Sequence, residues 1–159
     1  MANLYTKGTV VPFLIPTDAA FRIFKLLAGE PEAALDEEVW AALPDNWHAE
    51  GDAGEHYLTE ELQDGFYALS WEQPEDVGDT AIYIWTEEGS PDSIAEIVQW
   101  LLTQDTTGAR WATFEGAHVC SRMRPGQFGG FAWFITRDSL ACSGTQAWIL
   151  EQVRTFDAA

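Results

Sequence analysis

Residues 90–104 read SPDSIAEIVQWLLTQ, and this stretch holds the clearest structural signal in the chain. Ser90 is of a residue type that caps helix N-termini, and Pro91 follows at the first helical position, where its missing N–H costs nothing. Apolar side chains then recur at i, i+3, i+4, i+7 and i+8, namely at Ile94, Ile97, Val98, Leu101 and Leu102. The pattern predicts an amphipathic helix whose apolar stripe packs on a sheet.

Strand and helix patterns alternate on both sides of this helix. We expect strands at residues 9–15, 65–71, 80–86, 111–121 and 130–136, and further helices at residues 17–28, 31–43 and 145–153. The segment from about residue 45 to 64 is polar and contains glycine, so we expect an acidic loop or an irregular hairpin there.

This order of elements predicts an α+β fold. A mainly antiparallel sheet would carry the helices of residues 17–28, 91–103 and 145–153 on one face. The first six core elements match a ferredoxin-like βαββαβ core, to which one strand and one helix are added. The length of 159 residues and the 47% hydrophobic content suit a single domain spanning residues 1–159.

The N-terminus predicts a cytoplasmic protein, and this location in turn predicts the state of the two cysteines. The start of the chain lacks the charged and then apolar segments of a secretion signal, and no apolar run is long enough to cross a membrane. We therefore expect Cys120 and Cys142 to be reduced thiols without a catalytic role.

Charge is the most unusual property of the sequence. The chain has 26 acidic and 8 basic residues, a formal net charge of −18, and no Lys or Arg lies between Leu26 and Ala109. Such a surface repels nucleic acid and anionic membranes and attracts basic partners. The sequence therefore predicts a basic protein surface as partner, in particular that of a nucleic-acid-binding protein, and leaves the oligomeric state open.

The predicted partner-binding residues lie in the segment without basic residues. Three tryptophans within or beside it, Trp40, Trp47 and Trp71, would act as apolar anchors among the carboxylates if exposed, because aromatic side chains dominate binding hot spots. The full set is Glu37, Glu38, Trp40, Asp45, Trp47, Glu50, Asp52, Glu55, Glu60, Glu61, Asp64, Glu75, Asp76 and Asp79.

No motif in the sequence demands an enzyme, a metal or a cofactor. His118 and Cys120 lie two apart on a predicted strand and would share one face, but no Asn or Asp is placed to orient the imidazole. Residues 48–56 contain His, Glu and Asp side chains but match neither a calcium loop nor a zinc motif, and a solvated acidic loop is favoured.

An arginine group forms the remaining candidate site. Arg110, Arg122, Arg124 and Arg137 belong to the C-terminal strands and their connections, where an anion could bind. We expect these guanidinium groups to pair with the surplus carboxylates of the protein itself.

In charge and size the chain resembles the small acidic anti-restriction and anti-CRISPR proteins of phages and plasmids. B-DNA carries one charge per about 1.7 Å of axis, so the surplus of 18 charges corresponds to about 30 Å of duplex. Residues 120–130 are also similar to segments of phage and prophage proteins. The resemblance in charge and size implies a nucleic-acid mimic that occupies the basic groove of a defence protein, whereas the resemblance of residues 120–130 implies no activity.

Two alternatives explain the sequence differently. The acidity could serve only the solubility of an accessory protein or adaptation to high salt. A small enzyme could use His118 and Cys120, or the region of Arg122 and Arg124.

Overall fold

The computed structural model describes residues 4–120 and 129–157 of the chain. Its strands are β1 (Leu4–Val11), β2 (His48–Glu50), β3 (His56–Leu58), β4 (Leu69–Glu72), β5 (Tyr83–Thr86), β6 (Trp111–Cys120), β7 (Gly129–Thr136) and β8 (Leu140–Gly144). Its helices are α1 (Asp18–Gly29), α2 (Glu37–Ala42), the short 3-10 helix η1 (Asp45–Trp47), α3 (Glu60–Ala68), α4 (Pro91–Thr103) and α5 (Thr145–Asp157).

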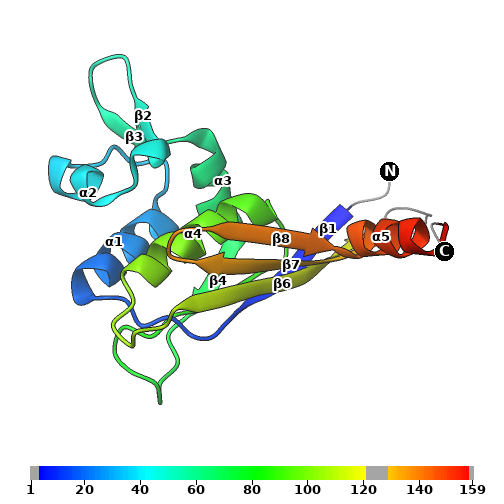
Figure 1. The fold of residues 1–159 in the computed structure, drawn as a ribbon. Coiled ribbons are helices and arrows are strands. Elements are labelled where there is room, and N and C mark those ends of the chain that lie inside the picture. The colour runs from blue at the N-terminus through cyan, green and yellow to red at the C-terminus, as the bar shows by residue number, and fades with distance from the viewer. Residues whose placement is uncertain (1–3, 121–128, 158–159) are drawn as a thin grey trace.

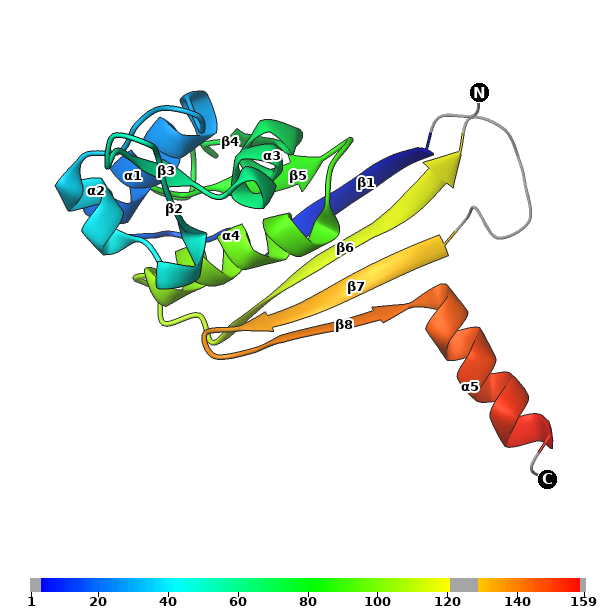
Figure 2. The same ribbon diagram turned by 90° about the horizontal axis from the view of Figure 1, so that it is seen from above.

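Six strands form one antiparallel sheet in the order β4-β5-β1-β6-β7-β8, and β2 and β3 form a separate hairpin. Helices α1, α3 and α4 lie on one face of the sheet, while the hairpin and α2 project beyond them (Figures 1 and 2). The predicted α+β class with a mainly antiparallel sheet is confirmed. The ferredoxin-like detail stays a prediction.

The core lies between α4 and the covered face of the sheet. Side chains that alternate along the strands point toward the helices and are buried, as Val10, Phe114 and Ile135 illustrate. The predicted stripe of α4 meets them, and its residues Ile94, Ile97, Val98, Leu101 and Leu102 are fully buried. The helix predicted from residues 90–104 is thereby confirmed.

The region from residue 60 to 71 differs from the prediction. We expected an acidic loop or an irregular hairpin up to Asp64 and a strand at 65–71. The β2–β3 hairpin is present, but α3 occupies Glu60–Ala68 and β4 begins only at Leu69. Leu62 and Phe66 are buried at helical spacing, and Gly65 between them lets α3 approach α4 closely. A Cβ atom at Gly65 would lie 2.7 Å from Cβ of Ser93, so this position tolerates no side chain.

Smaller differences concern element boundaries. Strand β1 begins at Leu4, whereas the β-branched pattern predicted residues 9–15, and the second helix is confined to Glu37–Ala42. The sequence prediction missed strand β8. Its residues carry no alternation of apolar and charged side chains, which is the signal that identifies a half-buried strand.

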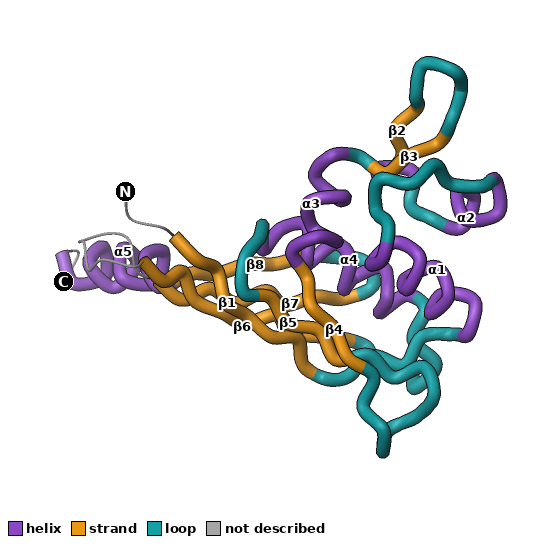
Figure 3. The backbone as a smooth tube through the Cα atoms, turned by 180° about the vertical axis from the view of Figure 1, so that it is seen from behind, coloured by secondary structure: helices purple, strands orange, loops and turns teal. Residues whose placement is uncertain are grey.

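Helix α5 contradicts the expectation that it covers the sheet. It extends past the end of the strands and lies over neither face (Figure 2; the same arrangement is seen from behind in Figure 3). Trp148, Ile149, Leu150 and Val153 are each at least half exposed. The reason is that β8 continues into α5 at Thr145 without a loop, so the chain has no room to turn back.

A buried aspartate ties the segment between β1 and α1 to the connection between α4 and β6. The carboxylate of Asp105 accepts hydrogen bonds from the backbone N–H groups of Ile15 (2.9 Å), Thr107 (2.9 Å) and Ala109 (3.0 Å) and from the Thr107 hydroxyl (2.7 Å). Burial alone would raise the pKa of this carboxyl, but the hydrogen bonds outweigh burial and hold the pKa below its ordinary value.

Truncating Leu101 to Ala should lower the free energy of unfolding by about 2–5 kcal/mol, because it removes a buried side chain and leaves a cavity. Leu26, on the exposed side of α1, is the matched control. Leu26→Ala should cost about 0.5 kcal/mol or less. Chemical denaturation measures both, and equal losses would contradict the core described above.

Replacing Asp105 with Asn should destabilise the protein by about 1–3 kcal/mol at neutral pH, because the amide cannot accept the same set of hydrogen bonds. A depressed carboxyl pKa stabilises the fold above the pKa of the unfolded chain, and this stabilisation is lost as pH falls through the folded-state pKa. The difference between wild type and variant should therefore shrink below about pH 4. Denaturation from pH 7 downward measures it, and a constant difference would contradict the assignment.

Candidate protein-binding interface

Most of the predicted partner-binding carboxylates belong to one projecting part of the molecule. We call residues 36–64, which comprise α2, η1, the β2–β3 hairpin and the start of α3, the acidic module. Its carboxylates predicted to bind a partner are all exposed: Glu37, Glu38, Asp45, Glu50, Asp52, Glu55, Glu60, Glu61 and Asp64.

Helix N-termini explain how several of these charges are tolerated. Asp36 caps α2 by accepting a hydrogen bond from the backbone N–H of Val39 at 2.8 Å. Glu37 and Glu38 occupy the first turn of α2, and Glu60 and Glu61 the first turn of α3. A carboxylate in the first turn of a helix is stabilised by the helix dipole, so these side chains face solvent without disrupting the fold.

Backbone hydrogen bonds hold the hairpin to the rest of the chain. The N–H of Leu35 donates to the carbonyl of His56 at 2.8 Å, and the N–H of Thr59 donates to the carbonyl of Trp47 at 2.9 Å. At the hairpin tip, Gly54 has a φ of 79°, a conformation that favours glycine. The exposed Asp52 and Glu55 therefore project from a defined turn.

Trp47 does not serve as the exposed anchor that we expected. Its side chain is only 1% exposed and packs against Phe66, with ring centroids 6.1 Å apart, and against Trp100 at 5.7 Å. Burying a large apolar side chain in the adjacent core is more favourable than leaving it exposed, which explains why the predicted exposure of Trp47 was wrong.

Trp40 is half-buried between two histidines. Its ring stacks on His48 at a centroid distance of 3.6 Å and on His56 at 4.3 Å. Two imidazoles at these distances would overlap on one face of the indole, so they occupy opposite faces. His48 Nε2 also lies 3.1 Å from the carbonyl oxygen of Trp40. The sandwich joins α2 to the hairpin, and spacing along the sequence did not reveal it.

The structure separates a second acidic group from the module. Glu75, Asp76 and Asp79 are exposed in the connection between β4 and β5. Figures 1 and 3 place this connection at the opposite end of the molecule from the β2–β3 hairpin. The acidic stretch that is continuous in sequence is thus two surfaces in space.

The acidic module lacks internal charge compensation. Lys7 and Glu87 form an ion pair at 3.8 Å outside the module. Within residues 4–120 and 129–157, no Lys or Arg nitrogen lies within 4.0 Å of a carboxylate oxygen of the module. The negative charge is therefore available to an approaching partner.

Of the candidate catalytic pair His118 and Cys120, the histidine packs within the sheet. His118 Nδ1 lies 3.1 Å from the hydroxyl oxygen of Thr6, and its ring packs near Phe131 at a centroid distance of 5.2 Å. The side chain of Cys120 lies outside the described residues, whereas Cys142 is an exposed free thiol. In the described part of the chain, no three His, Cys, Asp or Glu side chains gather as metal ligands.

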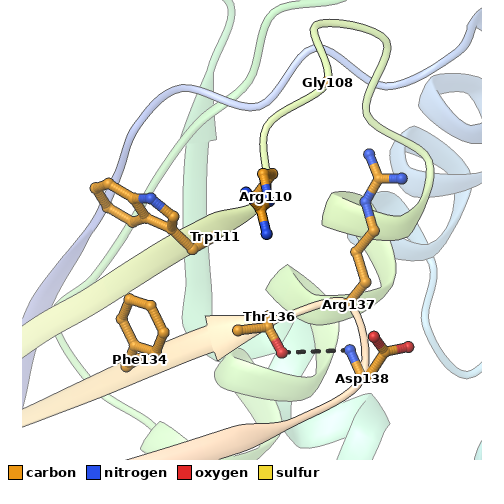
Figure 4. A pocket seen from close by; sticks show the side chains of 7 residues that line it. All are labelled: Gly108, Arg110, Trp111, Phe134, Thr136, Arg137 and Asp138. Carbon is orange, nitrogen blue, oxygen red and sulfur yellow. Dashed lines mark hydrogen bonds between the residues drawn. The ribbon is translucent and has the colours of Figure 1, made fainter.

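Two arginines of the predicted group meet at one open pocket of about 690 Å³ (Figure 4). Arg110 and Arg137 line it together with Trp111, Phe134 and Asp138. Neither arginine lies within 4.0 Å of a carboxylate in the described residues, so the expected pairing with internal acids is not observed for these two. Arg122 and Arg124 lie outside the described residues. The pocket can accept an anion, but all its charged side chains are exposed and none is held in place by burial.

Comparison with known proteins adds no relative: no family model, no curated protein and no solved structure matches the chain. Among the helices of the described residues, none has the length and apolar character needed to span a bilayer.

Replacing Trp40 with Ala should loosen the acidic module without unfolding the sheet, because the indole joins α2 to both histidines of the hairpin. We expect the free energy of unfolding to fall by about 1–3 kcal/mol. Backbone amides of residues 48–58 should exchange with deuterium faster, while those of β6 and β7 stay protected. Trp111→Ala, an exposed tryptophan on the sheet, should leave hairpin exchange unchanged. Unchanged hairpin exchange in the Trp40 variant would contradict this role of the sandwich.

Proposed function

We propose that the protein binds the basic groove of a nucleic-acid-binding protein through the acidic module and competes with nucleic acid for that groove. One observation carries the proposal. The carboxylates of the module are all exposed and have no cationic partner within the described residues, although the protein as a whole contains eight Lys and Arg. Exposed and uncompensated carboxylates stand in for the phosphates that such a groove binds.

Electrostatics determine the expected kinetics. A negative surface of this kind increases the rate of association with a positive surface. Salt screens the attraction at separations beyond the Debye length, which is about 8 Å at physiological ionic strength. Binding should therefore be fast and should weaken as salt increases.

The environment of the three tryptophans refines the proposal. Trp47 belongs to the core, Trp40 is enclosed by histidines and Trp71 is partly buried against Phe24, so none of them offers a large exposed apolar anchor. Interfaces with buried aromatic anchors retain affinity at high salt, whereas an interface dominated by charge does not. The affinity of this protein for its partner should accordingly depend strongly on ionic strength.

Because the two acidic groups are separate surfaces, only one of them needs to bind the groove. The acidic module displays charge on two helix ends and a hairpin that project from the body of the protein (Figure 1). The β4–β5 connection contributes only the smaller group Glu75, Asp76 and Asp79. We assign the groove-binding surface to the module.

Two variants with the same change in net charge test this assignment. The first reverses Glu37, Glu38, Glu60, Glu61 and Asp64 to Lys. The control reverses Glu75, Asp76, Asp79, Glu115 and Asp138, which are equally exposed but lie outside the module. The wild-type chain is used to retain a partner from a host lysate at low salt, and the affinity of that partner for each variant is then measured together with its displacement by duplex DNA.

The module variant should bind at least tenfold more weakly than the control variant. Five reversed charges remove attraction at the groove itself, whereas the same change elsewhere acts only through the long-range field. Equal affinities for the two variants, or affinity that does not change with salt, would show that the acidity serves solubility alone, and failure to compete with DNA would contradict binding to a nucleic-acid groove.

A further inference from the structure

The charge of the chain is divided sharply between its two parts. Residues 1–109 hold 22 of the 26 acidic residues and three of the eight basic ones, a formal charge of −19. Residues 110–159, which form β6, β7, β8 and α5, hold the remaining four acidic and five basic residues, a charge of +1. Two copies of this protein repel each other except where this nearly neutral part is involved.

Among the described strands, β8 is an edge strand whose own sequence does not protect it against pairing. It forms one border of the six-stranded sheet, and its sequence, Leu-Ala-Cys-Ser-Gly, contains neither a charge nor a proline. Soluble proteins commonly place charges or prolines on edge strands to prevent association. The opposite border, β4, ends at Glu72 and leads into the acidic connection.

The hydrogen bonds of the β7–β8 hairpin show which backbone groups are free. The N–H of Thr136 donates to the carbonyl of Ser139 at 2.9 Å, next to the Ile135–Leu140 pair of the register. Thr136 and Ser139 thus form a hydrogen-bonded pair, and the next pair, Ile135–Leu140, is non-bonded. Because the two kinds of pair alternate in an antiparallel ladder, Ala141 and Ser143 are the residues of β8 that are hydrogen-bonded to β7. The N–H and C=O groups of Leu140 and Cys142 therefore point to the open edge.

Helix α5 follows this edge strand directly and has an exposed apolar stripe. Ile149 and Val153 are four residues apart on the same side of the helix, with Trp148 and Leu150 beside them, and all four are at least half exposed. An isolated helix of 13 residues is only marginally stable in water, so packing of this stripe is needed to maintain it.

The stripe cannot fold back onto the sheet of its own chain. Helix α5 begins at Thr145, immediately after the last residue of β8. The hydroxyl of Thr145 accepts a hydrogen bond from the N–H of Gly130 at 2.6 Å and donates one to its carbonyl at 3.1 Å. This anchor and the absence of a loop set the direction of the helix away from the sheet (Figure 2).

We propose that β8 and α5 together form the interface of a two-fold symmetric dimer, with a second copy of this chain as the partner. The two β8 strands pair antiparallel about their central residue, Cys142, and extend the sheet across the dimer. Each α5 packs its apolar stripe against the second copy, at the end where the β8 strand of that copy begins.

The two-fold axis also resolves the electrostatic problem. The acidic module lies near the start of β8, because Asn46, Trp47 and Leu140 line one pocket. In an antiparallel pair the start of one β8 lies beside the end of the other, where α5 begins. Each acidic end thus meets the nearly neutral end of the second copy, and the two acidic modules do not face each other.

The first experiment measures the mass of the purified full-length chain in solution at micromolar concentration by light scattering and sedimentation equilibrium. We expect twice the mass of one chain. The double variant Ile149→Asp and Val153→Asp should weaken dimerisation at least tenfold, as should Cys142→Pro, which removes one free edge N–H while leaving the bonds to β7 intact.

A matched control separates this interface from a general effect of added acid. Leu26→Asp with Val77→Asp adds the same charge at two exposed apolar positions outside β8 and α5. This variant should dimerise as the wild type does. Circular dichroism checks that all variants keep their secondary structure.

A second measurement tests the strand register. Paired residues in an antiparallel ladder have Cα atoms about 5.5 Å apart, within reach of a disulfide. In a Cys120→Ser background, the oxidant diamide should take two electrons and two protons from the facing Cys142 thiols and join two chains by a bond that a reducing agent breaks. A single cysteine at the β7–β8 turn, Ser139→Cys with both native cysteines replaced by Ser, should not form this dimer.

The proposal is overturned if the wild-type chain has the mass of one copy at all concentrations tested. It is also overturned if the Asp variant of α5 dimerises like its control, or if Cys142 fails to join the chains. Because the acidic module is not altered in any of these variants, the outcome is independent of partner binding through that module.

Discussion

The contact between α4 and the covered face of the sheet is the interaction on which the rest of this structure depends. Ile94, Ile97, Val98, Leu101 and Leu102 are fully buried and belong to one hydrophobic cluster with Val10 of β1, Ile84 of β5, Phe114 of β6 and Ile135 of β7. Burial of such side chains contributes about 1.5–3 kcal/mol each, which is large beside the net stability of a domain. Both α3, through its close approach at Gly65, and the strands β6 and β7 are positioned by this helix.

This core makes the acidic surface possible. A net charge of −18 destabilises a compact chain by self-repulsion, so apolar burial has to offset it. The acids are also placed where they cost least. Several lie in the first turns of α2 and α3, and Asp105 is satisfied by backbone N–H groups. The carboxylates in these first turns stabilise their helices and are still exposed to solvent and to partners.

The two ends of the molecule have opposite chemical character. One end holds the acidic module, which is stabilised internally by Trp40 and Trp47 and presents charge to solvent. The other end holds α5, and the edge strand β8, which starts near the module, leads to it; β8 and α5 present open backbone groups and an apolar stripe. The first arrangement suits a charged partner, and the second suits another copy of a chain that otherwise repels itself. A single continuous core between the two ends allows both surfaces to exist on one small protein.

Local pattern determined much of this protein. Pro91 at the first helical position and the apolar spacing that follows it specify α4, Thr17 caps α1 by accepting a hydrogen bond from the N–H of Ala20, and the exposure of the carboxylates follows from the cost of burying a charge. These features depend on neighbours in the chain, and a sequence pattern therefore reveals them. Only the tertiary structure decided the environment of Trp47, the stacking of Trp40, the separation of the two acidic groups and the direction of α5. Each of these depends on which distant segment lies beside the residue, and an apolar side chain is equally suited to a core or to an interface until the fold determines what covers it.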